Sequence, residues 1–316
     1  MIDANARAAL EALLGDRIEF DVPLSRHTSL RIGGPADAMA TPADRDELGR
    51  LLALCTEHGV PTRVLGAGFN VLVSDAGLDG VVLRLKKLRR IERVAEDAIA
   101  VEAGASHATI TKYSVENGLS GLEFGAGIPG TLGGWLAMNA GIGVRELKDV
   151  VRTVTWMDSR GELAAPVARA DLDFRYRALA GLPAGCVLVG AELSVTPSDR
   201  ETVKAEIDRL LAHRTETQPT DIPSCGSVFR NPPGDFAGRL IEAAGLKGTR
   251  EGGAEISTVH ANFIVNHGGA TAKDVLALIE RARATVREAS GVELETEVQL
   301  IGRAELEDAD DGGAAR

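Results

Sequence analysis

Apolar residues recur three and four positions apart in several long stretches, which is the spacing that lines one face of a helix. The first stretch, MIDANARAALEALLG, reads as an amphipathic helix rather than a signal peptide. The pattern predicts helices over residues 1–15, 43–59, 107–117, 201–217, 236–246 and 271–291.

Shorter apolar runs between these helices have the length and composition of strands. We predict strands over residues 62–74, 80–85, 98–104, 151–157, 186–195, 259–266 and 292–302. Residues 25–39 read as a further strand that ends in a Gly-Gly-Pro turn. The chain therefore mixes helices and strands, and a break near residues 196–202 separates a glycine-rich front from an α+β back.

One uncharged stretch, Phe124 to Val144, is 21 residues long, which is about the length of a membrane span. It contains seven glycines and Pro129, a mixture that a helix tolerates poorly. We interpret it as a buried binding loop and expect no membrane insertion.

The formal net charge is −11, and five acidic residues and one arginine lie in residues 304–316. We expect that segment to be a disordered acidic tail. The rest carries about −7, which argues against binding to nucleic acid or to an anionic membrane. Three cysteines without a C-x-x-C pair, and six scattered histidines, indicate a reducing compartment without disulfides or a metal site. We therefore expect a cytoplasmic protein, and a monomer.

Two glycine-rich loops, residues 65–77 and 122–141, dominate the front of the chain. Exposed backbone N–H groups in such loops bind phosphate, and two loops suit a long ligand with a pyrophosphate in its middle. Neither loop matches the Rossmann or Walker A pattern. On spacing alone, tight turns that pack strand against helix are an equal alternative.

Three further segments carry candidate chemistry. Ser227 in PSCGSVFRNP lacks the G-x-S-x-G frame of a hydrolase nucleophile, and by itself it reads as an ordinary loop serine. In FRYR, Arg175 and Arg177 share one face if the segment is extended, and a guanidinium fits a carboxylate. In VELETEVQLIG, alternation places Glu293, Glu295 and Glu297 on one face, which reads as a solvent face.

These segments resemble, in order along the chain, the motifs of one enzyme family. They are HTSLRIGGPAD, LGAGFNVLV, GLSGLEFGAGIPGTLGGWLAMNAG, FRYR, PSCGSVFRNP, STVHANFIVN and VELETEVQLIG, from residue 27 to 302. The family is UDP-N-acetylenolpyruvoylglucosamine reductase (MurB). The resemblance implies an α+β fold, with an FAD-binding domain pair of the vanillyl-alcohol-oxidase (PCMH) type and a C-terminal substrate-binding domain. We expect an N-terminal segment (1–30), the FAD domain (31–197), the substrate domain (198–303) and the tail (304–316).

The resemblance also implies the cofactor, FAD, with NADPH as the hydride donor. The expected FAD-binding residues are Gly66, Ala67, Gly68, Phe69, Asn70, Val71, Gly127, Ile128, Pro129, Thr131, Gly133, Gly134, Asn139, Gly141 and Arg214. The family usually has serine where this chain has Phe69, and we expect that difference to adjust FAD affinity without abolishing binding.

By the same resemblance, Ser227 is the proton donor, Arg177 binds the substrate carboxylate and Glu297 is the catalytic carboxylate. Tyr176, Arg230 and Asn231 are expected substrate neighbours. The implied reaction is reduction of UDP-N-acetylglucosamine enolpyruvate to UDP-N-acetylmuramate in peptidoglycan synthesis. That step serves cell wall biogenesis and, through it, cell shape, cell division and the cell cycle.

The chain has no extra loop between Arg177 and Ser227, which resembles the short type of the family that lacks the tyrosine flap. Two alternatives stay open. One is an FAD-dependent sugar oxidase on the same fold. The other is a non-catalytic flavin-binding descendant, although Ser227, Arg177 and Glu297 are all retained.

Overall fold

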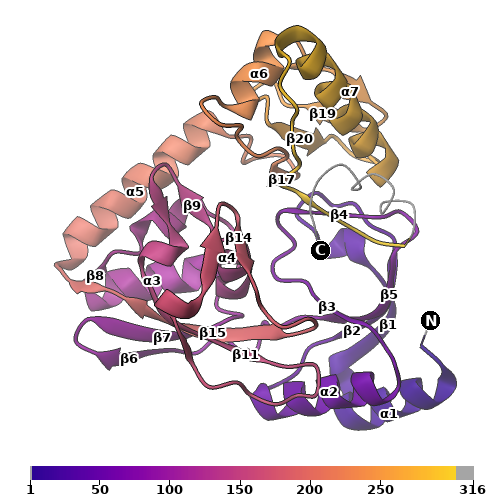
Figure 1. Cartoon of the computed structure of the whole chain (residues 1–316), viewed down its shortest axis with the longest axis vertical. Coiled ribbons are helices and arrows are strands. Elements are labelled where there is room, and N and C mark those ends of the chain that lie inside the picture. Colours follow the sequence, from indigo (N-terminus) through magenta and orange to yellow (C-terminus); the bar gives the residue numbers. More distant parts are fainter. Residues whose placement is uncertain (1, 304–316) are drawn as a thin grey trace. The chain divides into compact units, whose positions relative to one another are not determined.

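The structure is a computed structural model that describes residues 2–303, so the predicted acidic tail lies outside the described residues. The chain divides into two compact units, each built from separate segments (Figure 1). Unit 1 contains residues up to 20, 37–67 and 80–213, and unit 2 contains residues 21–36, 68–79 and the chain from 214 onward.

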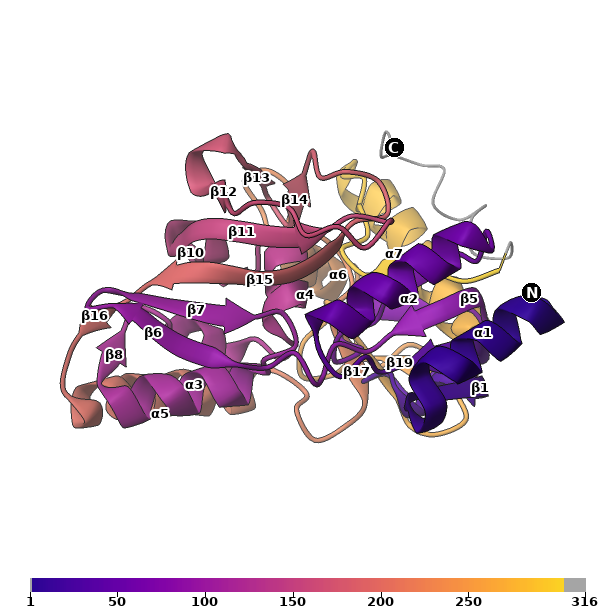
Figure 2. The ribbon, with the colours of Figure 1, turned by 90° about the horizontal axis from the view of Figure 1, so that it is seen from below.

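The largest sheet belongs to unit 1 and has the strand order β12-β11-β15-β7-β6. Its strands are β6 (Ile91–Ala95), β7 (Ala98–Glu102), β11 (Val151–Met157), β12 (Val167–Ala168) and β15 (Val187–Ser194). All its pairings are antiparallel. Helices α3 (His107–Asn117) and α4 (Leu132–Ala137) lie near strands of this sheet (Figure 2). They share a buried apolar cluster with the sheet, which includes Ile110, Trp135 and Val154.

A four-stranded sheet has the order β1-β2-β5-β3. Its strands are β1 (Ile18–Pro23), β2 (Pro35–Ala40), β5 (Leu78–Leu83) and β3 (Thr62–Val64). In unit 1, α1 (Ala4–Leu14) and α2 (Arg45–Glu57) bury Leu10 and Leu51 in one cluster with Val81. The apolar faces of these two helices therefore meet in a shared core, as amphipathic helices require.

Unit 2 contains the sheet β17-β20-β19-β18, formed by β17 (Ser224–Ser227), β20 (Phe263–Asn266), β19 (Ala254–Ile256) and β18 (Arg250–Glu251). Helices α6 (Ala237–Ala243) and α7 (Ala272–Ser290) share its apolar cluster. A reciprocal capping box between Thr271 and Asp274 starts α7, and Gly291 ends it in the left-handed conformation. Strand β4 (Val71–Val73) pairs in parallel with β21 (Gln299–Ile301).

The remaining elements are short, apart from α5 (Arg200–Thr217). The short strands are β8 (Leu119–Ser120), β9 (Gly141–Ile142), β10 (Arg145–Glu146), β13 (Asp173–Arg175), β14 (Ala178–Ala180) and β16 (Thr196–Pro197). The 3-10 turns are η1 (Gly15–Arg17), η2 (Leu24–Arg26), η3 (Glu123–Gly127), η4 (Leu147–Asp149) and η5 (Arg169–Asp171).

All six predicted helices are confirmed, but four predicted strands are wrong in extent. Residues 62–74 form two short strands, β3 and β4, with a loop between them, and of residues 259–266 only Phe263–Asn266 form a strand. Residues 25–39 hold the turn η2, and the strand begins at Pro35 instead of ending there. Arg31 and Gly33 have φ values of 57° and 136°, which break an extended chain. Of residues 292–302, only Gln299–Ile301 form a strand.

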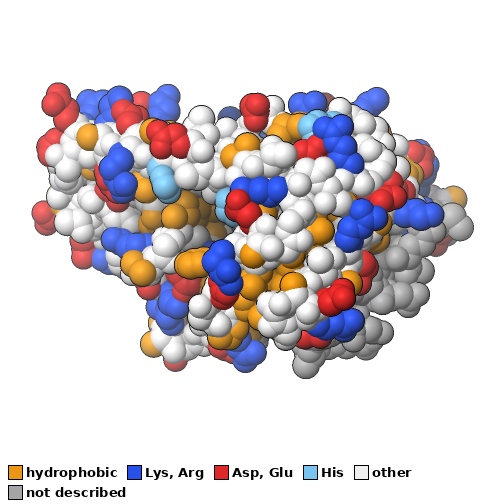
Figure 3. Space-filling view, turned by 90° about the horizontal axis from the view of Figure 1, so that it is seen from above, with side chains coloured by type: hydrophobic (Ala, Val, Ile, Leu, Met, Phe, Trp, Pro, Cys, Tyr) orange, Lys and Arg blue, Asp and Glu red, His pale blue; other side chains and the backbone are white. Residues whose placement is uncertain are grey.

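The uncharged stretch from 124 to 144 forms η3, the short helix α4 and β9, as expected for a folded loop region. Within residues 2–303, none of the helices is long and apolar enough to cross a membrane. On the face shown in Figure 3, Lys and Arg side chains are interspersed with Asp and Glu.

Candidate active site

Ser227 lies at the end of β17, where the strand is distorted. β17 pairs with β20 through Ser224–Val265 and Ser227–Phe263, with a bulge between them. Gly226 occupies the bulge at φ 85°, and a Cβ there would contact nothing within 4 Å. Glycine is therefore needed for the backbone conformation, and the half-buried Ser227 is set at the exit of the bulge.

Unit 2 brings the segment of Glu297 next to that of Ser227, although 70 positions separate these two residues in the chain. The carbonyl of Val228, the residue after Ser227, accepts from the N–H of Glu297 at 2.8 Å. Two residues after Val228, the N–H of Arg230 donates to the Glu295 carbonyl at 2.9 Å. The segment 294–298 therefore runs antiparallel to 228–230, and this pairing sets Glu297 beside the serine loop.

Asn262 fixes the serine segment from the other side. Its buried side chain accepts from Phe229 N–H at 2.9 Å and donates to the Phe229 carbonyl at 2.8 Å. Its own carbonyl accepts from Val228 N–H. The buried Asn262 side chain therefore ties the serine segment to the start of β20.

The first glycine loop leaves a run of backbone donors unused. The N–H of Leu65 donates to the Leu83 carbonyl, and the N–H of Asn70 donates to the Cys225 carbonyl. The four backbone N–H groups between them, in residues 66–69, meet no acceptor among residues 2–303. Gly68 has φ 73°, and a Cβ on it would overlap the His27 carbonyl oxygen. Only glycine therefore fits at residue 68.

The second glycine loop contains glycines of two kinds. A Cβ on Gly133 would press on Ala103 at 3.2 Å, and one on Gly127 would meet Ile142 at 2.7 Å. These two glycines allow close packing within the protein, which is the alternative that spacing alone left open.

Gly134 and Gly66 are the second kind, with open faces. Among the residues that the structure describes, a Cβ on Gly66 would contact only the Thr131 hydroxyl, at 3.0 Å, and one on Gly134 only that hydroxyl, at 3.8 Å. Thr131 precedes α4 but makes no side-chain cap bond to it. Within unit 1, two bare glycine faces around one hydroxyl, with the unused N–H groups of Gly66 and Ala67, form a cradle that could hold the phosphate and polyol oxygens of FAD.

Arg177 lies in a hairpin turn, so the prediction that it shares an extended face with Arg175 is wrong. β13 and β14 pair through Arg175–Ala178, and Arg177 in the turn has φ 55°. The Arg177 guanidinium donates to the Gly141 carbonyl at 3.2 Å and lies 4.8 Å from the centre of the Tyr176 ring. Arg175 instead points to solvent, 69% exposed, and pairs with Asp173.

Two residues around Arg177, the acidic Glu146 and the amide Asn139, were not predicted to act on it. Glu146 Oε1 lies 3.8 Å from Arg177 Nη1. Asn139, predicted as a cofactor residue, is fully buried, and its side-chain amide donates to Glu146 and to the Arg175 carbonyl. In the sequence, Asn139 belongs to the motif that ends in MNAG, whereas Glu146 lies five residues beyond that motif and carried no signal.

Other predicted site residues have partners within unit 2. Arg214 Nε donates to Gln218 at 3.3 Å, and burial lowers the pKa of Arg214. Arg230 lies 3.7 Å from Glu295, and its Nε is buried without an acceptor among the described residues. Asn231 Oδ1 accepts from Ala237 N–H at 3.1 Å, at the start of α6.

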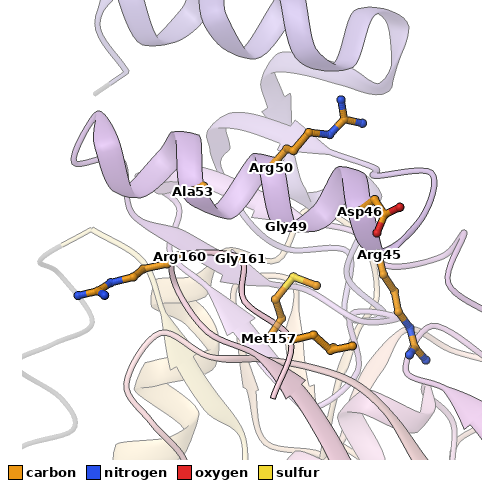
Figure 4. A pocket seen from close by; sticks show the side chains of 9 residues that line it. Arg45, Asp46, Gly49, Arg50, Ala53, Met157, Arg160 and Gly161 are labelled. Atoms are coloured by element: carbon orange, nitrogen blue, oxygen red, sulfur yellow. The ribbon is translucent and has the colours of Figure 1, made fainter. Parts of the chain in front are cut away.

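A pocket of about 410 Å³ lies elsewhere in unit 1, between α2 and residues 157–163. Figure 4 shows the side chains of Arg50 and Arg160 extending away from it. None of the predicted site residues lines this pocket. It is therefore separate from the candidate active site.

Two family models match the chain. "UDP-N-acetylenolpyruvoylglucosamine reductase, C-terminal domain" matches residues 218–301. "FAD binding domain" matches residues 36–165. Together they match both the glycine-loop region and the segment that carries Ser227 and Glu297.

Two curated relatives are named UDP-N-acetylenolpyruvoylglucosamine reductase. The protein from Anaeromyxobacter sp. (strain Fw109-5) is 47% identical, over 97% of this chain and 95% of its own length. The one from Geobacter sulfurreducens is 44% identical, over 93% of this chain and 97% of its own. The crystal structure of UDP-N-acetylenolpyruvylglucosamine reductase (MurB) from Thermus caldophilus matches with a TM-score of 0.78 and 36% identity. That match covers 90% of this chain and 98% of the other.

Proposed function

Since the chain belongs to the UDP-N-acetylenolpyruvoylglucosamine reductase family, we propose that its residues carry out the reduction for which that family is named. The protein is an NADPH-dependent FAD enzyme that converts UDP-N-acetylglucosamine enolpyruvate to UDP-N-acetylmuramate in peptidoglycan synthesis. The sugar-oxidase and non-catalytic alternatives are not favoured, because the curated relatives are named as reductases.

The observation that carries the assignment of roles is the pairing of the Ser227 segment with the Glu297 segment. Val228 joins them through its carbonyl, which accepts from Glu297 N–H. The serine and the glutamate thereby belong to two adjacent, hydrogen-bonded segments, and groups that act on one substrate need such a fixed spacing.

Reduction of the enolpyruvyl double bond adds a hydride to one carbon and a proton to the other. The chemistry that bound FAD supplies is transfer of the hydride from NADPH to the first carbon. The Ser227 hydroxyl gives its proton to the second carbon and then regains one from solvent. Serine is a weak acid, but an enolate-like carbon is basic enough to take that proton.

Arg177 receives the substrate carboxylate through its guanidinium, which offers paired donors in one plane. Glu297 is the carboxyl group that stabilises charge developing on the substrate next to Ser227. Tyr176, Arg230 and Asn231 contact the rest of the substrate. The buried Nε of Arg230, without an acceptor among the described residues, supports a ligand-binding role for that side chain.

The cofactor is held by the two glycine loops. The unused N–H groups of residues 66–69 bind the FAD diphosphate, and the Thr131 hydroxyl between Gly66 and Gly134 binds a further oxygen. The other proposed contacts are Asn70, Val71, Gly127, Ile128, Pro129, Gly133, Gly141 and Arg214. Asn139 is left out of this set, because its side-chain donors and acceptor are all used by protein groups.

We further propose that the protein acts as a monomer in the cytoplasm, where it supplies a wall precursor that growth, cell shape, division and the cell cycle require. The proposed FAD domain (31–197) and substrate domain (198–303) each contain one of the two matched family models.

An anaerobic absorbance experiment tests the proposal. NADPH should bleach the flavin band of the purified protein, and the UDP-enolpyruvyl sugar added next should restore it without oxygen. A band that recovers only with oxygen would favour an oxidase. A colourless protein that takes up no FAD would contradict both.

A further inference from the structure

The segment that follows α4 is engaged with the Arg177 hairpin. Asn139 comes two residues after the end of α4, with φ 40°, a left-handed conformation that asparagine tolerates better than most residues. Its side chain has no solvent exposure. A buried amide must find partners for two donor hydrogens and one acceptor, or it destabilises the fold.

All three partners of the Asn139 side chain come from the protein. Nδ2 donates to Glu146 Oε2 at 3.1 Å and to the Arg175 carbonyl at 2.9 Å. Oδ1 accepts from Lys148 N–H at 3.0 Å. Both donor hydrogens are therefore used, and the side chain joins the β13–β14 hairpin to β10 and to η4.

Glu146 continues this chain of contacts to Arg177. One carboxylate oxygen accepts from Asn139 and pairs with the Lys148 ammonium, and the other faces Arg177 Nη1 at 3.8 Å. Both side chains of the Glu146–Arg177 pair are largely buried, at 15% and 19% exposure. A carboxylate in such surroundings interacts more strongly with a guanidinium than it would in water.

The hairpin turn is thus held at two points. Asn139 fixes the backbone at Arg175, immediately before the two-residue turn, and Glu146 fixes the guanidinium of Arg177. Gly141 adds a backbone carbonyl that accepts from Arg177 Nη2 at 3.2 Å. These three residues come from one contiguous stretch of the chain, residues 138–146.

We propose that Asn139 and Glu146 are positioning residues, which hold the backbone and the guanidinium of Arg177 in the orientation that receives the substrate carboxylate. The proposal rests on the substrate-binding role proposed for Arg177. It assigns the end of the second glycine loop to the substrate, whereas the open cradle at Thr131 and Gly134 serves the cofactor.

The main variant is Asn139→Gly, because glycine keeps the left-handed backbone and removes only the amide. Glu146→Gln is the second variant, which keeps the shape and removes the charge, in case Asn139→Gly does not fold. Arg175→Gln is the matched control, since the Arg175 side chain is exposed and pairs with Asp173.

The readout is the pair of half-reactions, followed anaerobically in the flavin-loaded protein. For Asn139→Gly we expect normal FAD content and a rate of flavin reduction by NADPH within about twofold of the unchanged protein. Reoxidation by the UDP-enolpyruvyl sugar should slow by about 10-fold to 100-fold, the loss expected from a misplaced binding group. Glu146→Gln should show the same split, and Arg175→Gln should show neither effect.

A second readout does not depend on activity. Backbone amides of residues 145–150 and 173–180 should exchange hydrogen faster in Asn139→Gly, while those of β7 and β15 stay protected. Loss of FAD with unchanged exchange in the hairpin would overturn the proposal, since Asn139 would then be a cofactor contact. Equal slowing of both half-reactions would overturn it as well.

Failure of the proposed function gives a different result. In that case the unchanged protein itself would not be reoxidised by the UDP-enolpyruvyl sugar, which would also remove the carboxylate role of Arg177. The exchange experiment would still decide whether Asn139 holds the hairpin.

Discussion

The side-chain nitrogen of Asn70 donates to the backbone carbonyl of Glu297 across 3.1 Å. The backbone of Asn70 also donates to the Cys225 carbonyl and accepts from Gln299 N–H, each at 3.1 Å. A single residue at the end of the first glycine loop therefore connects the segment of Ser227 with that of Glu297. Asn70 adopts φ 57° to do so.

Replacement of Asn70 should distinguish its backbone role from its side-chain role. Asn70→Gly removes the bond to Glu297 and should lower the free energy of unfolding by about 1 kcal/mol. Asn70→Ala should be less stable still, by about 0.5–1 kcal/mol, because a Cβ is strained at positive φ. Urea unfolding measures both, and an alanine variant as stable as the glycine variant would contradict the argument.

Ser227→Ala should separate the two half-reactions. Flavin reduction by NADPH should proceed at the normal rate, because it needs no proton from Ser227. Turnover of the UDP-enolpyruvyl sugar should fall by about 100-fold or more, as expected for loss of a general acid. Stopped-flow absorbance measures both rates.

Ser224→Ala in the same strand is the control for Ser227→Ala. The backbone carbonyl of Ser224 accepts a hydrogen bond from the Ser29 hydroxyl, and the alanine variant keeps that carbonyl. Rapid turnover by Ser227→Ala would remove this serine from the proton-donor role.

Phe69→Ser should tighten FAD binding. Phe69 is partly exposed and its N–H belongs to the four unused donors, so a hydroxyl there adds one donor beside them. One added hydrogen bond is worth about 1 kcal/mol, so the Kd should fall by about fivefold. Flavin fluorescence titration of the stripped protein measures it, with Phe69→Ala as the control for loss of the ring. Weaker binding by the serine variant would show that the hydroxyl finds no oxygen to bond.

The two deeply buried cysteines should resist alkylation. Burial raises the pKa of Cys55 to about 11 and that of Cys225 to about 12, so both thiols stay neutral at pH 8. Iodoacetamide should therefore modify the native protein first at the less buried Cys186, as mass spectrometry of peptides would show. Fast labelling of Cys225 would contradict its interpretation as a packed residue.

The same pKa shifts predict how stability depends on pH. A thiol whose pKa is raised by folding stabilises the native state below its unfolded pKa, which is 9.0, and this contribution is lost as pH rises toward the folded value. The free energy of unfolding should thus fall between about pH 9 and 12. Cys55→Ala should reduce that fall, as urea titrations at each pH would show.

Local patterns in the sequence were sufficient for the helices and for many strands. The apolar spacing of residues 43–59 and 271–291 reports which face of each helix is buried, and that spacing depends only on neighbours within a turn or two. The glycine loops were found for the same reason, since glycine marks positions where the backbone needs space or positive φ. The family motifs indicated Arg177, Ser227 and Glu297 as site residues, in that order along the chain.

What each of those residues touches was decided by the tertiary structure. Glu297 reaches the Ser227 segment through backbone bonds to Val228, and most of the predicted strand 292–302 gives way to that irregular pairing. Arg177 does not share a face with Arg175, because it lies in the turn between β13 and β14 with φ 55°. Among the glycines, Gly133 packs on Ala103 whereas Gly134 faces open space, and no spacing rule separates them. Such contacts join residues far apart in the chain, so their partners are set by how the chain folds and leave no periodic trace in the sequence.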